Sequence, residues 1–329
     1  MAMLLLDRAN LEVRSEGETL VLFEAGERRG TVPIKLIDRC VIHGAQTRLD
    51  SGVLLKLAEA GVATVLFSPR LGRRVAIVLG PAHNDAAVRL AQATRVLDGD
   101  WCLAWARQIV RAKLARQHKV LCHWQVARPD ARKPLLDAQA QVATALRGVA
   151  DATSLESLRG LEGSAARAHF AGLAAVVPPV LAFSGRNRRP PRDPVNVCLS
   201  LAYTLLHMDA VQACHTAGVD PLLGFFHRPA FGRESLASDL IEPLRARADL
   251  WVWEQLRQRN LRDEHFSHDK GACVLGKAGR AAFYGSWHSQ AKPLRRWLRQ
   301  AAAHLAGQLR TQGAAWMDAQ ACLPDEADA

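Results

Sequence analysis

Residues 224–245, with the sequence GFFHRPAFGRESLASDLIEPLR, place one imidazole a short distance along the chain before Asp239 and Glu242. His227 ends a short apolar run, and a helix is expected to follow it. In that helix Asp239 and Glu242 are three residues apart, so they project from the same face. An imidazole and carboxylates can together bind a divalent cation, and carboxylate oxygens suit Mg²⁺ or Mn²⁺. The alternative is structural: His227 is a core residue, and the carboxylates face solvent or pair with Arg245.

A third carboxylate, Glu162, lies among small residues in the segment LEGSAAR. The expected helix over residues 154–170 has a buried face beside it, and an unpaired carboxylate next to such a face is costly. Glu162 therefore needs a partner. That partner is either a cation shared with other ligands or a neighbouring arginine, Arg159 or Arg167.

The charge of the chain indicates an anionic partner. The net charge is +11, and residues 1–80 carry eleven Lys and Arg against nine Asp and Glu, so most of the excess lies after residue 80. Four arginines gather in the Gly/Pro-rich segment GRNRRPPR and offer bidentate donors to phosphate, although a solvated loop would look the same; they are Arg186, Arg188, Arg189 and Arg192. Nucleic acid is favoured over a membrane surface, because no basic amphipathic helix stands out.

Two further patterns bear on the compartment. No apolar run approaches the ~20 residues that span a bilayer. The seven cysteines form no C-x-x-C pair, which favours reduced thiols in the cytoplasm over a disulfide framework.

The hydrophobic period changes along the chain and predicts an α+β protein of two domains. Before residue 80, short alternating β-branched segments predict strands at 4–6, 11–14, 19–23, 31–34, 39–42, 63–67 and 74–79. Asp50 and Ser51 are expected to open one helix at 53–59, and a tight turn at Pro69 and Gly72 is expected to join the last two strands. Later segments repeat with a period of 3.6. We therefore expect a small N-terminal β-domain, residues 1–80, a linker at 81–85, and a larger all-α catalytic domain, residues 86–329.

One long helix is predicted from Trp101 to about Lys119, capped by Asp100. Its buried stripe is expected to contain Trp101, Trp105, Ile109 and Ala112. Three cations fall largely off that stripe and are expected on a solvated face, with phosphate contact as the alternative; they are Arg107, Arg111 and Lys113.

Four segments in this order resemble the CRISPR-associated protein one family, the metal-dependent integrase of CRISPR spacer acquisition. They are LEGSAARAHF, RNRRPPRDPVNVCLS, GFFH and SLASDLIEPLR, and the resemblance covers nearly the whole chain. It implies Glu162, His227 and Glu242 as ligands of Mg²⁺ or Mn²⁺, with Asp239 as a nearby acidic residue of the catalytic site. No Walker loop, Rossmann fingerprint or nucleophile elbow competes with this interpretation.

The chain departs from the family pattern at two positions. His169 stands where a Tyr is common, and Arg228 stands where an acid often follows the His. Neither change removes a ligand, but both leave the CRISPR subtype open.

The resemblance also implies a reaction and partners. A DNA 3′-OH attacks the repeat phosphodiester, and with water as nucleophile the same site is an endonuclease. The implied partners are double-stranded DNA (spacer precursors and the CRISPR repeat), a second copy of the chain paired through the β-domain, and the small CRISPR-associated protein two. Two alternatives remain open: a repair nuclease acting on branched DNA, and a non-catalytic basic scaffold that binds DNA ends. The complete ligand set argues against the scaffold.

Overall fold

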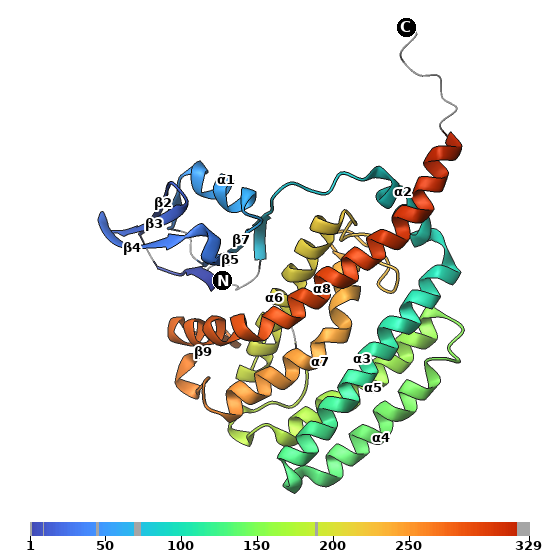
Figure 1. Ribbon diagram of the computed structural model, residues 1–329. Coiled ribbons are helices and arrows are strands. Elements are labelled where there is room, and N and C mark those ends of the chain that lie inside the picture. Colours follow the sequence, from blue (N-terminus) through green and yellow to red (C-terminus); the bar gives the residue numbers. More distant parts are fainter. Residues whose placement is uncertain (1, 9, 44–45, 69–73, 188–189, 321–329) are drawn as a thin grey trace. The chain divides into compact units, whose positions relative to one another are not determined.

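A computed structural model of the protein describes residues 2–8, 10–43, 46–68, 74–187 and 190–320 (Figure 1). Contacts divide the chain into two compact units, each built from three segments. Unit 1 consists of Met1–Ala82, Val177–Leu205 and Ala248–Pro293. Unit 2 consists of His83–Val176, Leu206–Arg247 and Leu294–Ala329.

The first segment of unit 1 is β-rich, as its alternating pattern predicts. Its described strands are β1 (Ala2–Leu6), β2 (Leu11–Glu16), β3 (Thr19–Glu24), β4 (Glu27–Pro33), β5 (Ile37–His43), β6 (Arg48–Leu49), β7 (Ala63–Phe67) and β8 (Arg74–Val78). Helix α1 spans Ser51–Glu59. Most bounds lie within two residues of the predicted ones, but β4 begins four residues earlier and the short β6 was not predicted. The predicted turn around Pro69 and Gly72 lies outside the described residues.

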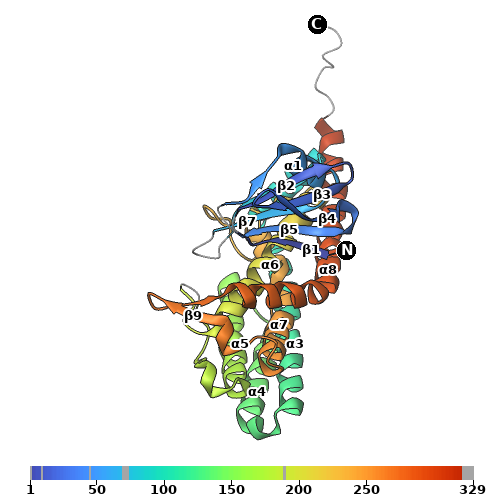
Figure 2. The same cartoon turned by 90° about the vertical axis from the view of Figure 1, so that its left-hand side faces the viewer.

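These strands form two four-stranded sheets with the orders β1-β5-β7-β8 and β4-β3-β2-β6. Strands β1, β5 and β7 are parallel neighbours, so the connection from β5 to β7 must cross over, and it contains α1. Asp50 caps α1 by accepting the Val53 N–H at 2.8 Å. The helix packs against β2 and β7 (Figure 2). Its Val53 and Leu57 are buried in the core of this segment with side chains from both sheets.

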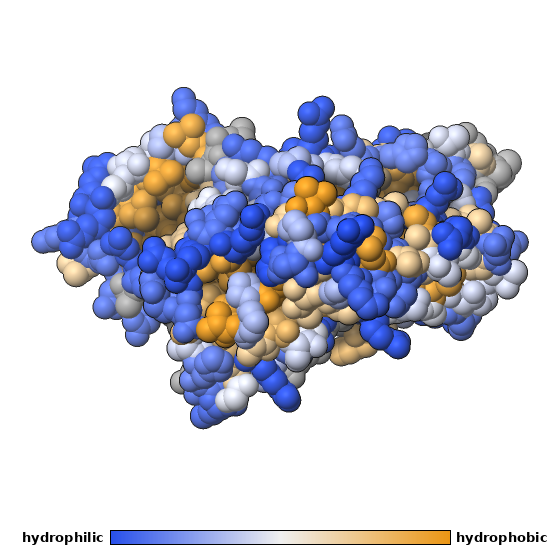
Figure 3. Space-filling model, turned by 90° about the horizontal axis from the view of Figure 1, so that it is seen from below, coloured by the Kyte–Doolittle hydropathy of each residue, from blue (hydrophilic) through white to orange (hydrophobic). Residues whose placement is uncertain are grey.

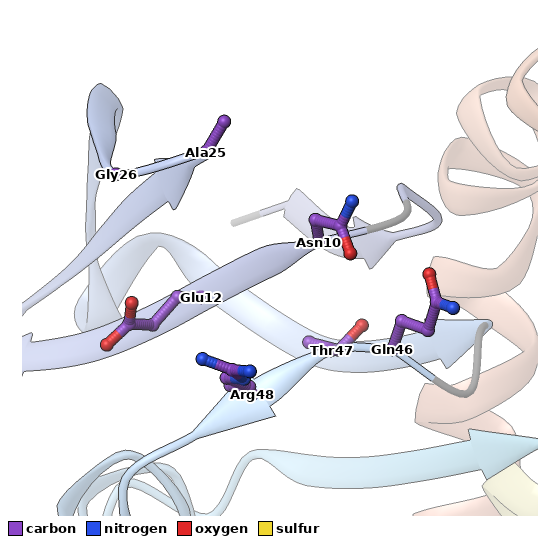
Figure 4. Close-up of a pocket in the computed structure, with 7 residues that line it drawn as sticks. All are labelled: Asn10, Glu12, Ala25, Gly26, Gln46, Thr47 and Arg48. Carbon is purple, nitrogen blue, oxygen red and sulfur yellow. The ribbon is translucent and has the colours of Figure 1, made fainter.

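The surface of the same segment holds a polar pocket of about 520 Å³. It lies beside β2, β6 and the turn between β3 and β4, and Figure 4 shows its lining residues: Asn10, Glu12, Ala25, Gly26, Gln46, Thr47 and Arg48. None of the predicted site residues lines it.

The rest of unit 1 is mostly helical, with one exception. Strands β9 (Phe266–Asp269) and β10 (Ala272–Leu275) form an antiparallel hairpin. The part after residue 85 is therefore not all α, although helices dominate it. The predicted class, a β-rich N-terminal region followed by a mostly helical part, is confirmed.

Unit 2 is helical in its described part. It contains α2 (Ala86–Leu97), α3 (Gly99–Ala127), α4 (Arg132–Gly148) and α5 (Leu155–Val176), together with portions of α6 (Pro194–Ala217), α7 (Ser235–Arg257) and α8 (Lys277–Gln320). Helices α3, α4 and α5 pack side by side (Figure 1). The N-cap of α3 is Asp98, not Asp100, because the Asp98 carboxylate accepts the Trp101 N–H at 3.0 Å. The helix also extends beyond the predicted end at Lys119.

Close packing of the three helices depends on Gly172 of α5. A Cβ at this position would lie 2.4 Å from Leu121 Cδ2 of α3 and 3.4 Å from Leu135 Cδ2 of α4. Replacing Gly172 by Val is therefore expected to destabilise the protein by about 1–3 kcal/mol, the usual cost of overpacking a core. The measurement is the free energy of unfolding in urea.

Gly160, on the same helix, supplies the matched control. A Cβ there meets nothing within 4 Å, so Gly160→Ala is expected to stabilise the helix by roughly 0.5–1 kcal/mol. Equal stability of the Gly172→Val variant and the wild type would show that α3 and α5 do not depend on this close approach.

Among the described residues, one helix is long and apolar enough to cross a bilayer by length and composition. This helix is α6, although no apolar run in the sequence was expected to approach bilayer length. Of its most apolar 18-residue window, 67% is buried inside the protein, as in a core helix. The face seen in Figure 3 is largely hydrophilic, with hydrophobic residues in scattered patches.

Candidate active site

Glu162 and Glu242 meet on a single ammonium group inside unit 2. Glu162 comes from α5 and Glu242 from α7. Between them lies Lys113 of α3, whose Nζ donates to Glu162 Oε1 and, at 2.5 Å, to Glu242 Oε2. The observed partner of Glu162 is therefore Lys113, and not the expected Arg159 or Arg167. Arg159 instead donates to the Phe226 carbonyl at 3.1 Å and approaches Glu156 at 3.6 Å.

Glu242 is buried and is held at both of its oxygens. Its Oε1 accepts from Arg245 Nε at 2.9 Å, and its Oε2 accepts from Lys113. Burial alone would raise the pKa of Glu242, but the charges of Arg245 and Lys113 outweigh it and hold that pKa at about 2. The pairing with Arg245 that the sequence offered as a structural alternative is thus present, yet it occupies only one oxygen.

Lys113 itself contradicts the sequence-based prediction of a solvated face. Its side chain is only 7% exposed. The buried stripe of α3 runs through Ala106, Val110 and Leu114, in phase with Lys113. Burial alone would lower the pKa of Lys113, but Glu242 and Glu162 outweigh it and raise that pKa. The ammonium is therefore charged at neutral pH, and it balances the two carboxylates.

The predicted buried stripe contained Trp101, Trp105 and Ala112, but all three are partly exposed in the structure. The prediction was therefore one position out of phase along the helix. A stripe drawn through Ile109, Val110 and Leu114 would have included Lys113. That phase is the sequence signal that could have identified the residue.

Asp239 organises the segment that carries His227. Its carboxylate is fully buried and accepts three backbone N–H groups: Phe225 and Phe226 on Oδ2, at 2.8 and 2.9 Å, and His227 on Oδ1, at 2.9 Å. Oδ1 also lies 2.7 Å from His227 Nδ1. An ionised carboxylate only accepts hydrogen bonds, so Nδ1 carries the hydrogen, and Nε2 of the neutral ring keeps its lone pair for a ligand. Metal-binding histidines are commonly oriented in this way.

The donor set fits a divalent cation, although its members are not gathered as ligands. Within the described ranges, no three His, Cys, Asp or Glu side chains form a group that could hold a metal ion. Instead, two carboxylates share one cation, the Lys113 ammonium. Carboxylate oxygens and imidazole nitrogens are donors that Mg²⁺ or Mn²⁺ takes.

The predicted DNA-binding arginines lie in unit 1 and differ in their surroundings. Arg186 is partly buried and held in place: it donates to Asn196 Oδ1 at 2.7 Å and to Ser200 Oγ at 3.0 Å, and it lies over the Tyr203 ring. Arg192 is exposed. The other two, Arg188 and Arg189, lie outside the described residues.

Comparison with known proteins decides the family. The sequence model of the family described as CRISPR associated protein Cas1 matches residues 4–289. The chain belongs to this family. The resemblance found in the sequence motifs is therefore confirmed.

Individual relatives agree with this assignment. A CRISPR-associated endonuclease Cas1 of Thermodesulfovibrio yellowstonii is 34% identical over 292 residues, covering 86% of this chain and 89% of the relative. A casposase bound to integration product has the same fold, with a TM-score of 0.83 and 22% identity, covering 95% of this chain and 91% of that one. A chain of a Cas6-RT-Cas1–Cas2 complex gives a TM-score of 0.78 and 23% identity over 94% of this chain and 35% of its own. At these identities the two structures show the fold alone.

Proposed function

We propose that this protein is a metal-dependent DNA integrase and endonuclease of CRISPR adaptation. It joins the 3′-OH of spacer DNA to the phosphodiester of the CRISPR repeat. Membership of the Cas1 family supports the activity, and so does the name of the relative from Thermodesulfovibrio yellowstonii, an endonuclease. The observation that carries the proposal is the meeting of two carboxylates from different helices on one cation, within a chain of this family.

In this proposal the ligands are Glu162, His227 and Glu242, and the ion is Mg²⁺ or Mn²⁺. When bound, the ion would supply Lewis-acid polarisation of a phosphate oxygen and stabilise the leaving oxygen. The chain's own side chains then have distinct tasks. Asp239 fixes the tautomer and the orientation of the His227 ring, and Arg245 holds one Glu242 oxygen so that the other faces Lys113 and Glu162.

The proposed partners follow from the family. They are double-stranded DNA, a second copy of this chain, and a small CRISPR-associated protein two, and the proposed location is the cytoplasm. The name of the Cas6-RT-Cas1–Cas2 complex supports the companion protein, because a chain with this fold assembles with Cas2 there. The net charge of +11 supports DNA, since contacts with phosphate need cationic side chains.

The test is a strand-transfer assay. A DNA duplex with free 3′-OH ends is incubated with a plasmid that contains repeats, the protein, the companion protein, and Mn²⁺ or Mg²⁺. We expect covalent joining of the duplex to the plasmid, and its loss in EDTA. Cleavage of branched DNA without any joining would favour a repair nuclease. DNA binding without either reaction would favour a scaffold.

Arg192 allows a separate test of DNA contact. Because its side chain is exposed, Arg192→Ala is expected to weaken DNA binding across sequences without changing the melting temperature, and to make the salt dependence shallower by about one phosphate contact. Arg186→Ala should instead lower the melting temperature, because it removes the hydrogen bonds to Asn196 and Ser200. Unchanged affinity and salt dependence for Arg192→Ala would assign that residue to solvent.

A further inference from the structure

The Lys113 ammonium lies between the carboxylates of two proposed metal ligands, Glu162 and Glu242. Its Nζ contacts Glu162 Oε1 and Glu242 Oε2 together. These are carboxylate oxygens from two different helices, and a divalent ion bound by both residues would gather them in the same way. Lys113 comes from a third helix, so one side chain connects three elements of unit 2.

The charges at this point explain why a cation is needed. The carboxylates of Glu162 and Glu242 both contact Lys113 Nζ, so they are close enough to repel each other. Burial makes that repulsion stronger than it would be in water. Arg245 neutralises Glu242 from the Oε1 side only. Without Lys113 the two carboxylates would therefore carry one uncompensated negative charge in a partly buried place.

A lysine side chain is suited to be a cation that an incoming metal ion displaces. An ammonium is a compact point charge on a flexible four-carbon stem, whereas an arginine would hold carboxylates in a fixed bidentate geometry. The backbone beneath Lys113 is anchored, because Val110 and Leu114 on either side of it are buried. The side chain can therefore leave the carboxylates while α3 stays in place.

We propose that Lys113 is a positioning residue that occupies the place of the divalent ion between Glu162 and Glu242, and that ion binding displaces it from these carboxylates. The inference rests on the proposed function, because it takes the two carboxylates as metal ligands. Lys113 then has two effects: it keeps the carboxylates together when no ion is bound, and it competes with the ion. Both effects can be measured without following the reaction.

The experiment uses the full chain and Mn²⁺ alone as the probe. Lys113→Met removes the charge but keeps an unbranched side chain. In EDTA this variant should melt roughly 10 °C below the wild type, because breaking a buried ion pair leaves charge uncompensated. In titration calorimetry it should bind Mn²⁺ about tenfold more tightly or better, since the competing unit charge is gone. A merely structural lysine would lower stability without tightening Mn²⁺ binding.

Arg116→Met is the matched control. Arg116 also lies on α3 and donates to the Pro243 carbonyl of α7 at 3.2 Å, so it contacts the same helix through a backbone oxygen. Its replacement should lower the melting temperature but leave the Mn²⁺ affinity unchanged. Tighter Mn²⁺ binding by both variants would mean that loosening α3 against α7, and not the charge of Lys113, controls the site.

A double variant covers the case in which Lys113→Met does not fold. Lys113→Met combined with Glu162→Gln removes one positive and one negative charge, so its stability in EDTA should recover relative to Lys113→Met alone. Failure of both variants to fold would overturn the proposal. If the Glu162→Gln variant binds Mn²⁺ as tightly as the wild type does, the proposed metal site itself is refuted. If Glu162→Gln weakens Mn²⁺ binding but Lys113→Met leaves the Mn²⁺ affinity unchanged, only the proposed role of Lys113 is refuted.

Discussion

Glu162→Gln and Glu242→Gln are each expected to lower strand transfer by at least about a hundredfold, because losing even an outer partner of a metal ligand costs 10–100-fold. Each change keeps the shape of the side chain and removes the charge that would attract the ion. His227→Ala is expected to have a similar effect, since it removes the imidazole nitrogen. All three variants should still bind DNA, because the proposed phosphate contacts lie elsewhere. The measurement is the initial rate of joining in Mn²⁺, beside a DNA-binding titration.

Glu156→Gln is the matched control for this series. Glu156 lies on α5 with Glu162, but it is exposed and its only ion pair in the described structure is a long one with Arg159, at 3.6 Å. Its replacement should leave the rate unchanged. If joining persists in EDTA and in all three site variants, the carboxylates and the imidazole are structural, and the metal-dependent mechanism is wrong.

Asp239→Ala is expected to have the largest effect on stability. The change removes an acceptor of three backbone N–H groups and of the His227 ring, and two of those N–H groups are in buried residues. Each buried donor left unsatisfied costs about 1–3 kcal/mol. A fall in melting temperature of roughly 10 °C or more follows. Strand transfer should fall as well, because the His227 ring loses the carboxylate that accepts from its Nδ1.

This expectation is larger than the one that the sequence supports. The family resemblance makes Asp239 a neighbour of the three ligands, so its replacement should be milder than theirs. Ser238→Ala tests the difference, because Ser238 precedes Asp239 on α7 and its hydroxyl donates to the carbonyl of Glu234, the residue before the helix. An Asp239→Ala variant that melts and reacts like Ser238→Ala would show that the carboxylate does not hold the loop.

The sequence by itself determined what local patterns can encode. Alternation predicted most strands of the N-terminal region, and Asp50 predicted the start of α1, because capping and strand periodicity are properties of neighbouring residues. The ordered motifs around Glu162, His227 and Glu242 identified the family, since those residue types and their order along the chain can be recognised without coordinates.

The tertiary structure decided which groups meet. Lys113 is 49 residues from Glu162 and 129 from Glu242, so no local pattern connects them. A lysine between apolar residues of a helix is compatible with a solvated face or with a buried one, and only the carboxylates presented by α5 and α7 make burial favourable. Asp239 is a similar case. Its spacing from Glu242 predicts a shared helix face, but the backbone N–H groups that it accepts belong to a loop whose path depends on packing.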